Sequence, residues 1–479
     1  MCAISRCLVL ACALYSGFAH SATVVVQHVG SIAPNASELV SVNCPSGMYA
    51  LSGGILPGNV FQAEVGANGP MYASTTLLSM PAGTATGPTG WYGVIHSFYN
   101  ASMTGTVTAV CTTDSGVMSV IGAGTVPAAT GTQANFGGVL PNCPSGLVAT
   151  GGGGDTSDHT LMKISGSSPL LSSTLPNGFP AYNHPDGTYG APVGWNTFVR
   201  NQRTSTGSMV GAAICAPYSG IVSVLHNFGV PATTLPVGAA GTATCPVGKV
   251  AIGGGMDMAN VVNGVTVYSV PSVPDTKPPS YPARPDGTYS TSDSWIASFF
   301  SYVTTGFAAT TVAICADAPR ATATLFLNTT LNHYFMTSDD AEVTAIGNGA
   351  AGPGWTQLPE HFLVVDRGAS AAGSGNVCRF YGTPGKGPNS HFYTIDPAEC
   401  AAVKLDPGWT YEAIAFRAFY PISAGACPAG TVNVYRVYNN RFAFNDSNHR
   451  YTTSLTTYNT MIAAGWNGEG TVFCAIATS

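Results

Sequence analysis

Histidine, tyrosine, tryptophan and glutamate recur in the same order near the C-terminus, and they are the candidate ligand-binding residues of this chain. The set occurs twice, as His391, Tyr393, Trp409 and Glu412 and again as His449, Tyr451, Trp466 and Glu469. An aromatic ring offers an apolar face on which a sugar ring stacks, and polar groups beside it can bond the sugar hydroxyls. The pattern therefore predicts a glycan-binding surface. The alternative is architectural, because core residues recur wherever a fold recurs.

After the predicted leader, the chain contains none of the common catalytic signatures. It has no Gly-x-Ser-x-Gly, His-Glu-x-x-His or Ser-x-x-Lys pattern. Paired glycosidase carboxylates stay open, since their separation is a spatial property. The candidates are Asp339, Asp340, Glu342, Glu360, Glu412 and Glu469. The first three fit the acidic first turn of a helix capped by Ser338. We expect no catalytic residue, no metal and no cofactor.

The candidate residues lie in three copies of one unit between Ala321 and Ser479. Each copy has a strand-like segment, a histidine-aromatic-threonine strand, a short helix, a Gly-Trp turn and a last strand. The histidine strands are Asn332–Thr337, Ser390–Thr394 and Asn448–Thr452, and the helices are Asp339–Ile346, Pro397–Lys404 and Leu455–Ala464. In the first copy, Leu358 replaces the glutamate that follows the tryptophan in the other two. The pattern predicts a pseudo-threefold, β-rich, trefoil-like module over residues 320–479.

Two segments of this module carry a resemblance to a known family. Cys378–Gly385 and Gly465–Gly470 closely match the signature Arg-x-Tyr, His-Phe-Tyr-Thr, Gly-Trp, Glu-Gly. This signature is typical of a repeat module at the C-termini of secreted bacterial proteins, which the chain resembles over residues 321–479. The family is of unknown function and often accompanies secreted hydrolases. The resemblance implies an accessory binding role.

The front part of the chain repeats a second unit three times. Each copy opens with Cys-Pro-x-Gly and a glycine cluster, and it closes with a cysteine that lies 20 residues after a tryptophan. We pair the opening and closing cysteines as Cys44–Cys111, Cys143–Cys215 and Cys245–Cys315. β-Branched and aromatic residues between them predict a disulfide-pinned β-sandwich in each copy. The pattern resembles an accessory repeat of secreted bacterial proteins, without assigned chemistry, over Ala22–Pro319.

Two motifs of these repeats have a functional and a structural interpretation. Gly151–Gly154 could cradle a phosphate, but no helix pattern and no Gly-Lys-Ser/Thr follows, so we expect a tight turn or a β-bulge beside the disulfide. Asp155, Asp158 and His159 could ligate calcium or zinc, but they lack calcium-loop spacing, so we expect a polar loop tip. Pro185–Tyr189 and Pro285–Tyr289 both read Pro-Asp-Gly-Thr-Tyr, which predicts turns.

The N-terminus predicts export. Met1–Ser21 has a basic residue, an apolar stretch and small residues before a cleavage site after Ser21, as in a signal peptide. A lipoprotein site at Cys12 and a retained anchor are alternatives, but the apolar stretch is short for both. Ten cysteines remain after cleavage and no Cys-x-x-Cys occurs, which favours disulfides in an extracellular or periplasmic protein. Among four C-terminal cysteines we favour Cys378–Cys400 and Cys427–Cys474.

Composition limits the remaining classes. Of 479 residues only 8% are charged, and the net charge is −6 with 16 lysines and arginines, which argues against a nucleic-acid partner. We expect a mainly β protein with repeats at 22–118, 119–219 and 220–319 before the 320–479 module. The favoured function is a secreted adhesion or binding protein, whose module contacts a glycan or cell-surface polymer from a stalk of repeats. The alternatives are a structural component that self-associates and, least favoured, a secreted hydrolase.

Overall fold

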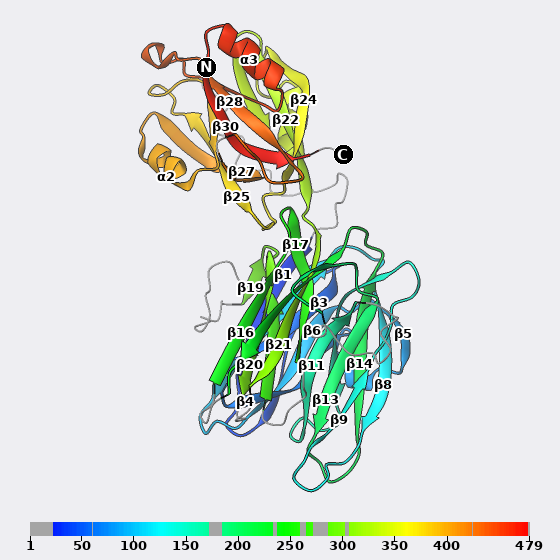
Figure 1. The fold of residues 1–479 in the computed structure, drawn as a ribbon. Helices are drawn as coiled ribbons and strands as arrows, with labels where there is room; N and C mark the ends of the chain where they lie inside the picture. The colour runs from blue at the N-terminus through cyan, green and yellow to red at the C-terminus, as the bar shows by residue number, and fades with distance from the viewer. Residues whose placement is uncertain are drawn as a thin grey trace. The chain divides into compact units, whose positions relative to one another are not determined.

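The computed structural model describes residues 23–59, 61–171, 184–232, 237–258, 265–271, 286–301, 306–423 and 425–477. The predicted signal peptide Met1–Ser21 lies outside these residues. The described chain forms two compact units, with the division between Asp317 and Ala318. Antiparallel strands make up most of both units, so the predicted mainly β class is confirmed. Figure 1 shows the strands of each unit and the short helices of the second.

All five predicted disulfides are present. They are Cys44–Cys111, Cys143–Cys215, Cys245–Cys315, Cys378–Cys400 and Cys427–Cys474. The first three join residues 67, 72 and 70 positions apart, one bridge in each front repeat. Each such crosslink removes loop-closure entropy from the unfolded chain, which stabilises the fold by ~4 kcal/mol in the chain-entropy model. Disulfides of this kind persist in oxidising compartments.

The first unit contains seven strands from each repeat. The first repeat supplies β1 (Thr23–Ile32), β2 (Ser37–Asn43), β3 (Tyr49–Pro57), β4 (Ala63–Met71), β5 (Gly83–Thr86), β6 (Gly90–Ser97) and β7 (Met103–Thr112), with a 3₁₀ turn at Leu77–Ser79. The second supplies β8 (Met118–Val126), β9 (Asn135–Val139), β10 (Val148–Thr156), β11 (Met162–Leu170), β12 (Gly187–Tyr189), β13 (Gly194–Asn201) and β14 (Gly207–Ala216). The third supplies β15 (Val222–Val230), β16 (Val237–Thr244), β17 (Lys249–Met258), β18 (Val265–Pro271), β19 (Gly287–Tyr289), β20 (Ser294–Ser301) and β21 (Phe307–Asp317).

Of the four described sheets of this unit, three combine strands of two repeats, and the fourth contains strands of the third repeat alone. One sheet has the order β2-β6-β4-β10-β14-β8-β5, and the second has the order β12-β15-β21-β17-β11-β13-β9. The strands that correspond to these in the third and first repeats form two separate sheets, with the orders β19-β1-β7-β3 and β16-β20-β18. The short strands β5, β12 and β19 pair with β8, β15 and β1 of the following repeat, the third repeat being followed by the first. The repeats therefore close a ring within one compact unit, and the expected boundaries after residues 118 and 219 fall inside it.

The two Pro-Asp-Gly-Thr-Tyr segments join neighbouring repeats. Asp286 accepts the backbone N–H of Val29 at 2.8 Å and bonds the ring of His28, both in β1. Asp186 bonds Asn227 and His226 of β15 in the same way. The aspartate of the motif thus bonds the strand with which the adjoining Gly-Thr-Tyr pairs. Pro285, the first residue of one predicted turn, lies outside the described residues.

The glycine clusters lie where the central strands β3, β10 and β17 meet around the pseudo-threefold axis. The Thr150 hydroxyl donates to the Leu51 carbonyl at 3.0 Å, and the Ser52 hydroxyl donates to the Ile252 carbonyl at 2.6 Å. A Cβ atom on Gly253 would stand 1.8 Å from the Thr150 carbonyl oxygen, which completes the cycle of close approaches. Only glycine allows backbones to come this close.

A β-bulge lies beside the disulfide of each front repeat, as expected for the glycine cluster Gly151–Gly154 of the second repeat. The register of β10 on β14 shifts between Ala149 and Gly151, directly after Ala149 pairs with Cys215. The same shift occurs after Ala50 and after Ala251. The interpretation as a bulge is confirmed, and Gly151–Gly154 lie in strand β10.

The acidic cluster of the second repeat is only partly a loop tip. Asp155 is buried in β10, where it accepts the Tyr92 hydroxyl at 2.5 Å and bonds His159 Nε2 at 2.7 Å. The loop-tip prediction is wrong for this residue, because two polar partners from neighbouring strands and turns replace its water. Asp158 and His159 do lie in the turn after the strand. Among the described residues, no group of three or more His, Cys, Asp or Glu side chains is arranged to hold a metal ion.

The second unit contains three copies of one four-element motif. The copies are β22 (Arg320–Asn328), β23 (His333–Thr337), α1 (Asp340–Gly347) and β24 (Trp355–Val365); β25 (Ser374–Gly382), β26 (His391–Thr394), α2 (Pro397–Leu405) and β27 (Trp409–Phe419); and β28 (Thr431–Tyr438), β29 (His449–Thr452), α3 (Leu455–Ala463) and β30 (Asn467–Ile476). All three predicted helices form. Asp339 rather than Ser338 caps α1, because its carboxylate accepts the Ala341 and Glu342 N–H groups.

A pseudo-threefold arrangement joins these copies. Their last strands β24, β27 and β30 pair with one another at Leu363–Ile476, Val365–Arg417 and Phe419–Cys474. The described strands form no closed barrel. The buried core between the copies includes Phe362, Phe416 and Phe473, which occupy equivalent positions of the three last strands. Side chains around this axis therefore come from neighbouring copies, and three seams result between them.

Candidate functional site

In each copy of the second unit the first two strands form a hairpin, and its register shows which residues of the three copies are equivalent. His391 lies opposite Tyr381, and His449 lies opposite Tyr438, in the first two strands of their copies. At the equivalent place in the first copy, Tyr334 lies opposite Leu327. The regular spacing of the histidines in the sequence is thus misleading for the first copy. Its strand β23 is one residue longer, which moves His333 out of the frame of the other two.

The first seam, between copies one and two, contains a row of aromatic rings. Trp355 contacts Phe335 with ring centroids 6.1 Å apart, and Phe335 contacts His391 at 4.6 Å. His391 then contacts Tyr381 at 4.9 Å. Phe335 is buried, whereas the other three rings are partly exposed. This seam therefore presents ring surface from two copies.

The second seam, between copies two and three, repeats this row. Trp409 contacts Phe392 at 5.8 Å, Phe392 contacts His449 at 5.0 Å, and His449 stacks on Tyr438 at 4.8 Å. Trp409 and Tyr438 are partly exposed, and His449 is buried. Trp409 consequently shares a row with the histidine of the next copy, not with His391 of its own.

One arginine and two glutamates accompany each of these rows. At the first seam, Arg379 forms a bidentate pair with Glu342 of α1, at 2.7 and 3.0 Å, and its Nε lies 2.8 Å from Glu412. At the second seam, Arg436 pairs with Glu399 of α2 at 3.2 Å and with Glu469 at 2.6 Å. Both glutamates after the tryptophans lie at register shifts of their strands. The bulges turn these carboxylates toward the arginines.

The two histidines are uncharged at neutral pH. Burial lowers the pKa of His391, although the neighbouring Glu412 carboxylate, 3.5 Å away, opposes this effect. Burial and the charge of Arg436 lower the pKa of His449 to about 3. For Glu412, burial alone would raise the pKa, but His391 and Arg379 together lower it. The carboxylate therefore stays ionised while the imidazoles stay neutral.

Tyr393 and Tyr451 belong to the core. Their exposed fractions are 1% and 3%, and their rings contact each other at 5.4 Å. The Tyr451 hydroxyl donates to the Tyr393 carbonyl at 2.7 Å, and the Tyr393 hydroxyl donates to the Met336 carbonyl. Burial raises the pKa of both hydroxyls. These hydroxyls tie the middle strands of successive copies together.

The third seam, between copies three and one, has a different composition. Leu325, Leu358 and Thr457 occupy the places of the arginine and the two glutamates. Arg450 stacks on Tyr334, with its guanidinium 5.0 Å from the ring centroid, and Trp466 contacts the same ring at 6.1 Å. Three exchanged residues thus remove one positive and two negative charges together.

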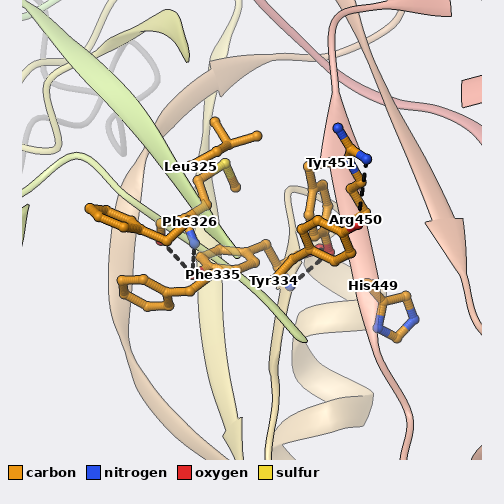
Figure 2. Close-up of a pocket in the computed structure, with 9 residues that line it drawn as sticks. Leu325, Phe326, Tyr334, Phe335, His449, Arg450 and Tyr451 are labelled. Carbon is orange, nitrogen blue, oxygen red and sulfur yellow. Dashed lines mark hydrogen bonds between the residues drawn. The ribbon is translucent and has the colours of Figure 1, made fainter. Parts of the chain in front are cut away.

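A small pocket lies at this third seam (Figure 2). The close-up shows Arg450 beside Tyr334, whose hydroxyl accepts from the guanidinium at 3.4 Å. The pocket has room for about one water molecule. It is therefore too small to hold a sugar ring. Its lining comes from all three copies: Leu325, Phe326, Tyr334, Phe335, Met336, Tyr393, His449, Arg450 and Tyr451.

The eight predicted ligand-binding residues are thus distributed over four places, the three seams and the core. His391 with Glu412 lies at the first seam; Trp409, His449 and Glu469 lie at the second, Trp466 at the third, and Tyr393 and Tyr451 in the core. The sequence reasoning did not include Trp355, Tyr381, Tyr438, Arg379 and Arg436. The repeated Arg-x-Tyr spacing was the signal for the last four, since residues two apart share a face of a strand.

Comparison with known proteins identifies part of the chain. Residues 291–419 and 321–476 match a family described as a domain of unknown function (DUF5648). The match covers the second unit, in agreement with the C-terminal module of unknown function expected from the sequence. No curated protein matches the chain. Among the described residues, no helix has the length and apolar character needed to cross a membrane.

Proposed function

We propose that this chain is an exported, non-catalytic binding protein whose second unit recognises a glycan or another cell-surface polymer. The observation that carries the proposal is the repeated site at the first and second seams. Each has a partly exposed tryptophan, a tyrosine whose ring contacts a histidine, and a glutamate whose side chain is 30% exposed. Ring faces for stacking and carboxylates for hydroxyl groups are what a sugar requires.

Two similar seams on one unit suit a polymer of repeating residues. When one seam is occupied, a second sugar of the same chain meets the other seam as an intramolecular partner. The effective concentration of that second sugar raises the overall affinity without new contacts. A repeated site therefore favours adhesion to a polymer over capture of a small metabolite.

The state of the carboxylates supports binding rather than catalysis. A glycosidase needs one carboxylic acid that keeps its proton near neutral pH, and its pKa must be raised. The pKa of Glu412 is lowered instead, with Arg379 and His391 beside it. Glu469 forms an ion pair with Arg436 at 2.6 Å. Export is part of the proposal and rests on Met1–Ser21 and on the five disulfides.

The test is binding of the full exported chain to an array of glycans and bacterial polysaccharides. Saturable binding that falls at least tenfold in the double variant Trp355→Ala/Trp409→Ala supports the proposal. Phe442→Ala is the matched control, because Phe442 is 81% exposed in the same unit but outside both rows. A blank array with folded protein rejects glycan binding. Light scattering across concentration then tests the alternative, a structural component that self-associates.

A further inference from the structure

The charges of the first and second seams do not balance. At the first seam one guanidinium, Arg379, faces the two carboxylates of Glu342 and Glu412. At the second seam Arg436 faces Glu399 and Glu469. The histidine of each seam adds no positive charge at neutral pH, because burial keeps it uncharged. Each seam therefore carries one uncompensated negative charge.

The arginines are not available to a ligand anion. Arg379 bonds Glu342 through both Nη atoms, and its Nε lies 2.8 Å from the Glu412 carboxylate. Its side chain is 11% exposed, and that of Arg436 is 9% exposed. An acidic sugar at either seam would therefore meet a partly exposed carboxylate without a free cation to offset the repulsion.

The aromatic rows already accommodate positive charge. The guanidinium of Arg436 lies 4.9 Å from the centroid of Phe392, and that of Arg379 lies 5.7 Å from Phe335. Ring faces attract cations through their quadrupole, and the attraction is stronger where water is partly excluded. An additional cation from a ligand would find both a carboxylate and ring faces at each of these seams.

The third seam provides an internal comparison. Its arginine, Arg450, lies 3.8 Å from a single carboxylate, Glu360, so this pair is balanced. The positions that hold the two glutamates elsewhere hold Leu358 and Thr457. The excess negative charge is thus a property of two seams and not of the fold.

We propose that the first and second seams bind a sugar that carries a free amine, such as the units of a deacetylated hexosamine polymer. The ammonium group would bond Glu412 or Glu469, and the apolar face of the sugar would stack on the neighbouring rings. This inference rests on the proposed glycan binding and names the class of sugar. The charge on the ligand distinguishes it from neutral and acidic glycans.

The test compares three soluble oligomers with the full chain by calorimetry: glucosamine hexamer, N-acetylglucosamine hexamer and oligogalacturonate. The glucosamine hexamer should bind at least tenfold more tightly than the other two, and its affinity should fall as salt is added. The double variant Glu412→Gln/Glu469→Gln should weaken its binding at least tenfold. Glu38→Gln, in strand β2 of the first unit, removes the same charge elsewhere and should change little.

A second variant keeps the test decisive if the glutamine substitutions disturb folding. Tyr381→Leu/Tyr438→Leu removes one ring from each row, and Leu327 occupies the equivalent place at the third seam. Equal or tighter binding of the neutral or acidic oligomer overturns the amine specificity and leaves glycan binding standing. Equal weakening by Glu38→Gln identifies general attraction to an acidic protein and also overturns it. No binding of any glycan removes the proposed function itself.

Discussion

Single glycines and buried charges determine how the repeats of the first unit can pack. Gly152 lies against Trp195, and a Cβ atom there would stand 2.2 Å from the indole Cγ and 2.3 Å from the Ala212 carbonyl. Gly53 and Gly254 meet Trp91 and Trp295 in the same way. The repeated Gly-Trp relation is therefore one of packing, because a fully buried indole takes the place of a Cβ atom.

We predict that Gly152→Ala destabilises the first unit by about 3 kcal/mol or more, since neither the indole nor the backbone can move away freely. Chemical denaturation with the disulfides intact measures this change. Gly122→Ala is the control, because its nearest atom, Val139 Cβ, lies at an ordinary 3.7 Å. Equal stability of the two variants would contradict the packing argument.

The shifted pKa of Lys163 allows a prediction of how the stability of the first unit depends on pH. Burial, assisted by Arg200, lowers the pKa of Lys163 from 10.5 to about 8, although Glu64 opposes the shift. Between pH 8 and 10 the unfolded chain thus keeps a proton that the folded chain has lost. Stability should rise over this range, by at most about 3 kcal/mol. Above pH 10 it should fall, because burial and Asp155 raise the pKa of Tyr92.

Denaturant midpoints from pH 7 to pH 10 measure this dependence. Lys163→Met removes the titrating group while Arg200 keeps its 2.6 Å bond to Glu64. The variant should lose the rise between pH 8 and 10, whatever its absolute stability. The same slope in the variant and the wild type would assign the pH dependence to other groups.

At the scale of elements, the seams of the second unit show how a charged network is exchanged for an apolar one. The network uses one residue from the first strand, one from the last strand and one from the helix of the preceding copy. All three change together at the third seam, where leucine, leucine and threonine replace them. A buried charge without its partners is costly, so these positions are coupled.

We predict that Arg436→Leu alone destabilises the second unit by about 3 kcal/mol, because it leaves Glu399 and Glu469 facing each other. Adding Glu469→Leu and Glu399→Thr, which copies the third seam, should restore most of this loss. Thermal unfolding of the single and triple variants measures the coupling. Additive losses in the triple variant would show that the residues act independently.

At the scale of the whole molecule, strand exchange makes the first unit a ring rather than a row of domains. Each of β5, β12 and β19 completes a sheet of the following repeat. A single repeat would leave these partners and its face on the pseudo-threefold axis exposed. The cost of that exposed surface is larger than one disulfide can offset.

We predict that an isolated second repeat, residues 119–219, does not fold as a monomer even with Cys143–Cys215 formed. The three repeats together should unfold in one transition. The amide dispersion in an NMR spectrum of the isolated repeat measures the first point, and calorimetry of residues 22–317 measures the second. A well-dispersed monomer spectrum would mean that each repeat folds alone and that the ring is assembled from finished domains.

The sequence by itself determined the repeats, the three disulfides of the front repeats, the mainly β class and the three helices of the second unit, whereas the structure decided between the connectivities of the four C-terminal cysteines. These features depend on local patterns: cysteines at matched positions, alternating β-branched and aromatic residues, and helix starts. A tight turn or a bulge beside the disulfide was also expected for Gly151–Gly154, and the structure has the bulge.

Only the tertiary structure decided which residues meet. Sequence order grouped Trp409 with His391, but the seam places Trp409 with His449, because neighbouring copies share the pseudo-threefold axis. One extra residue in β23 moved His333 out of the common frame, and a bulge turned Glu412 toward Arg379. Such outcomes depend on contacts between strands far apart in the chain, and no local pattern contains them.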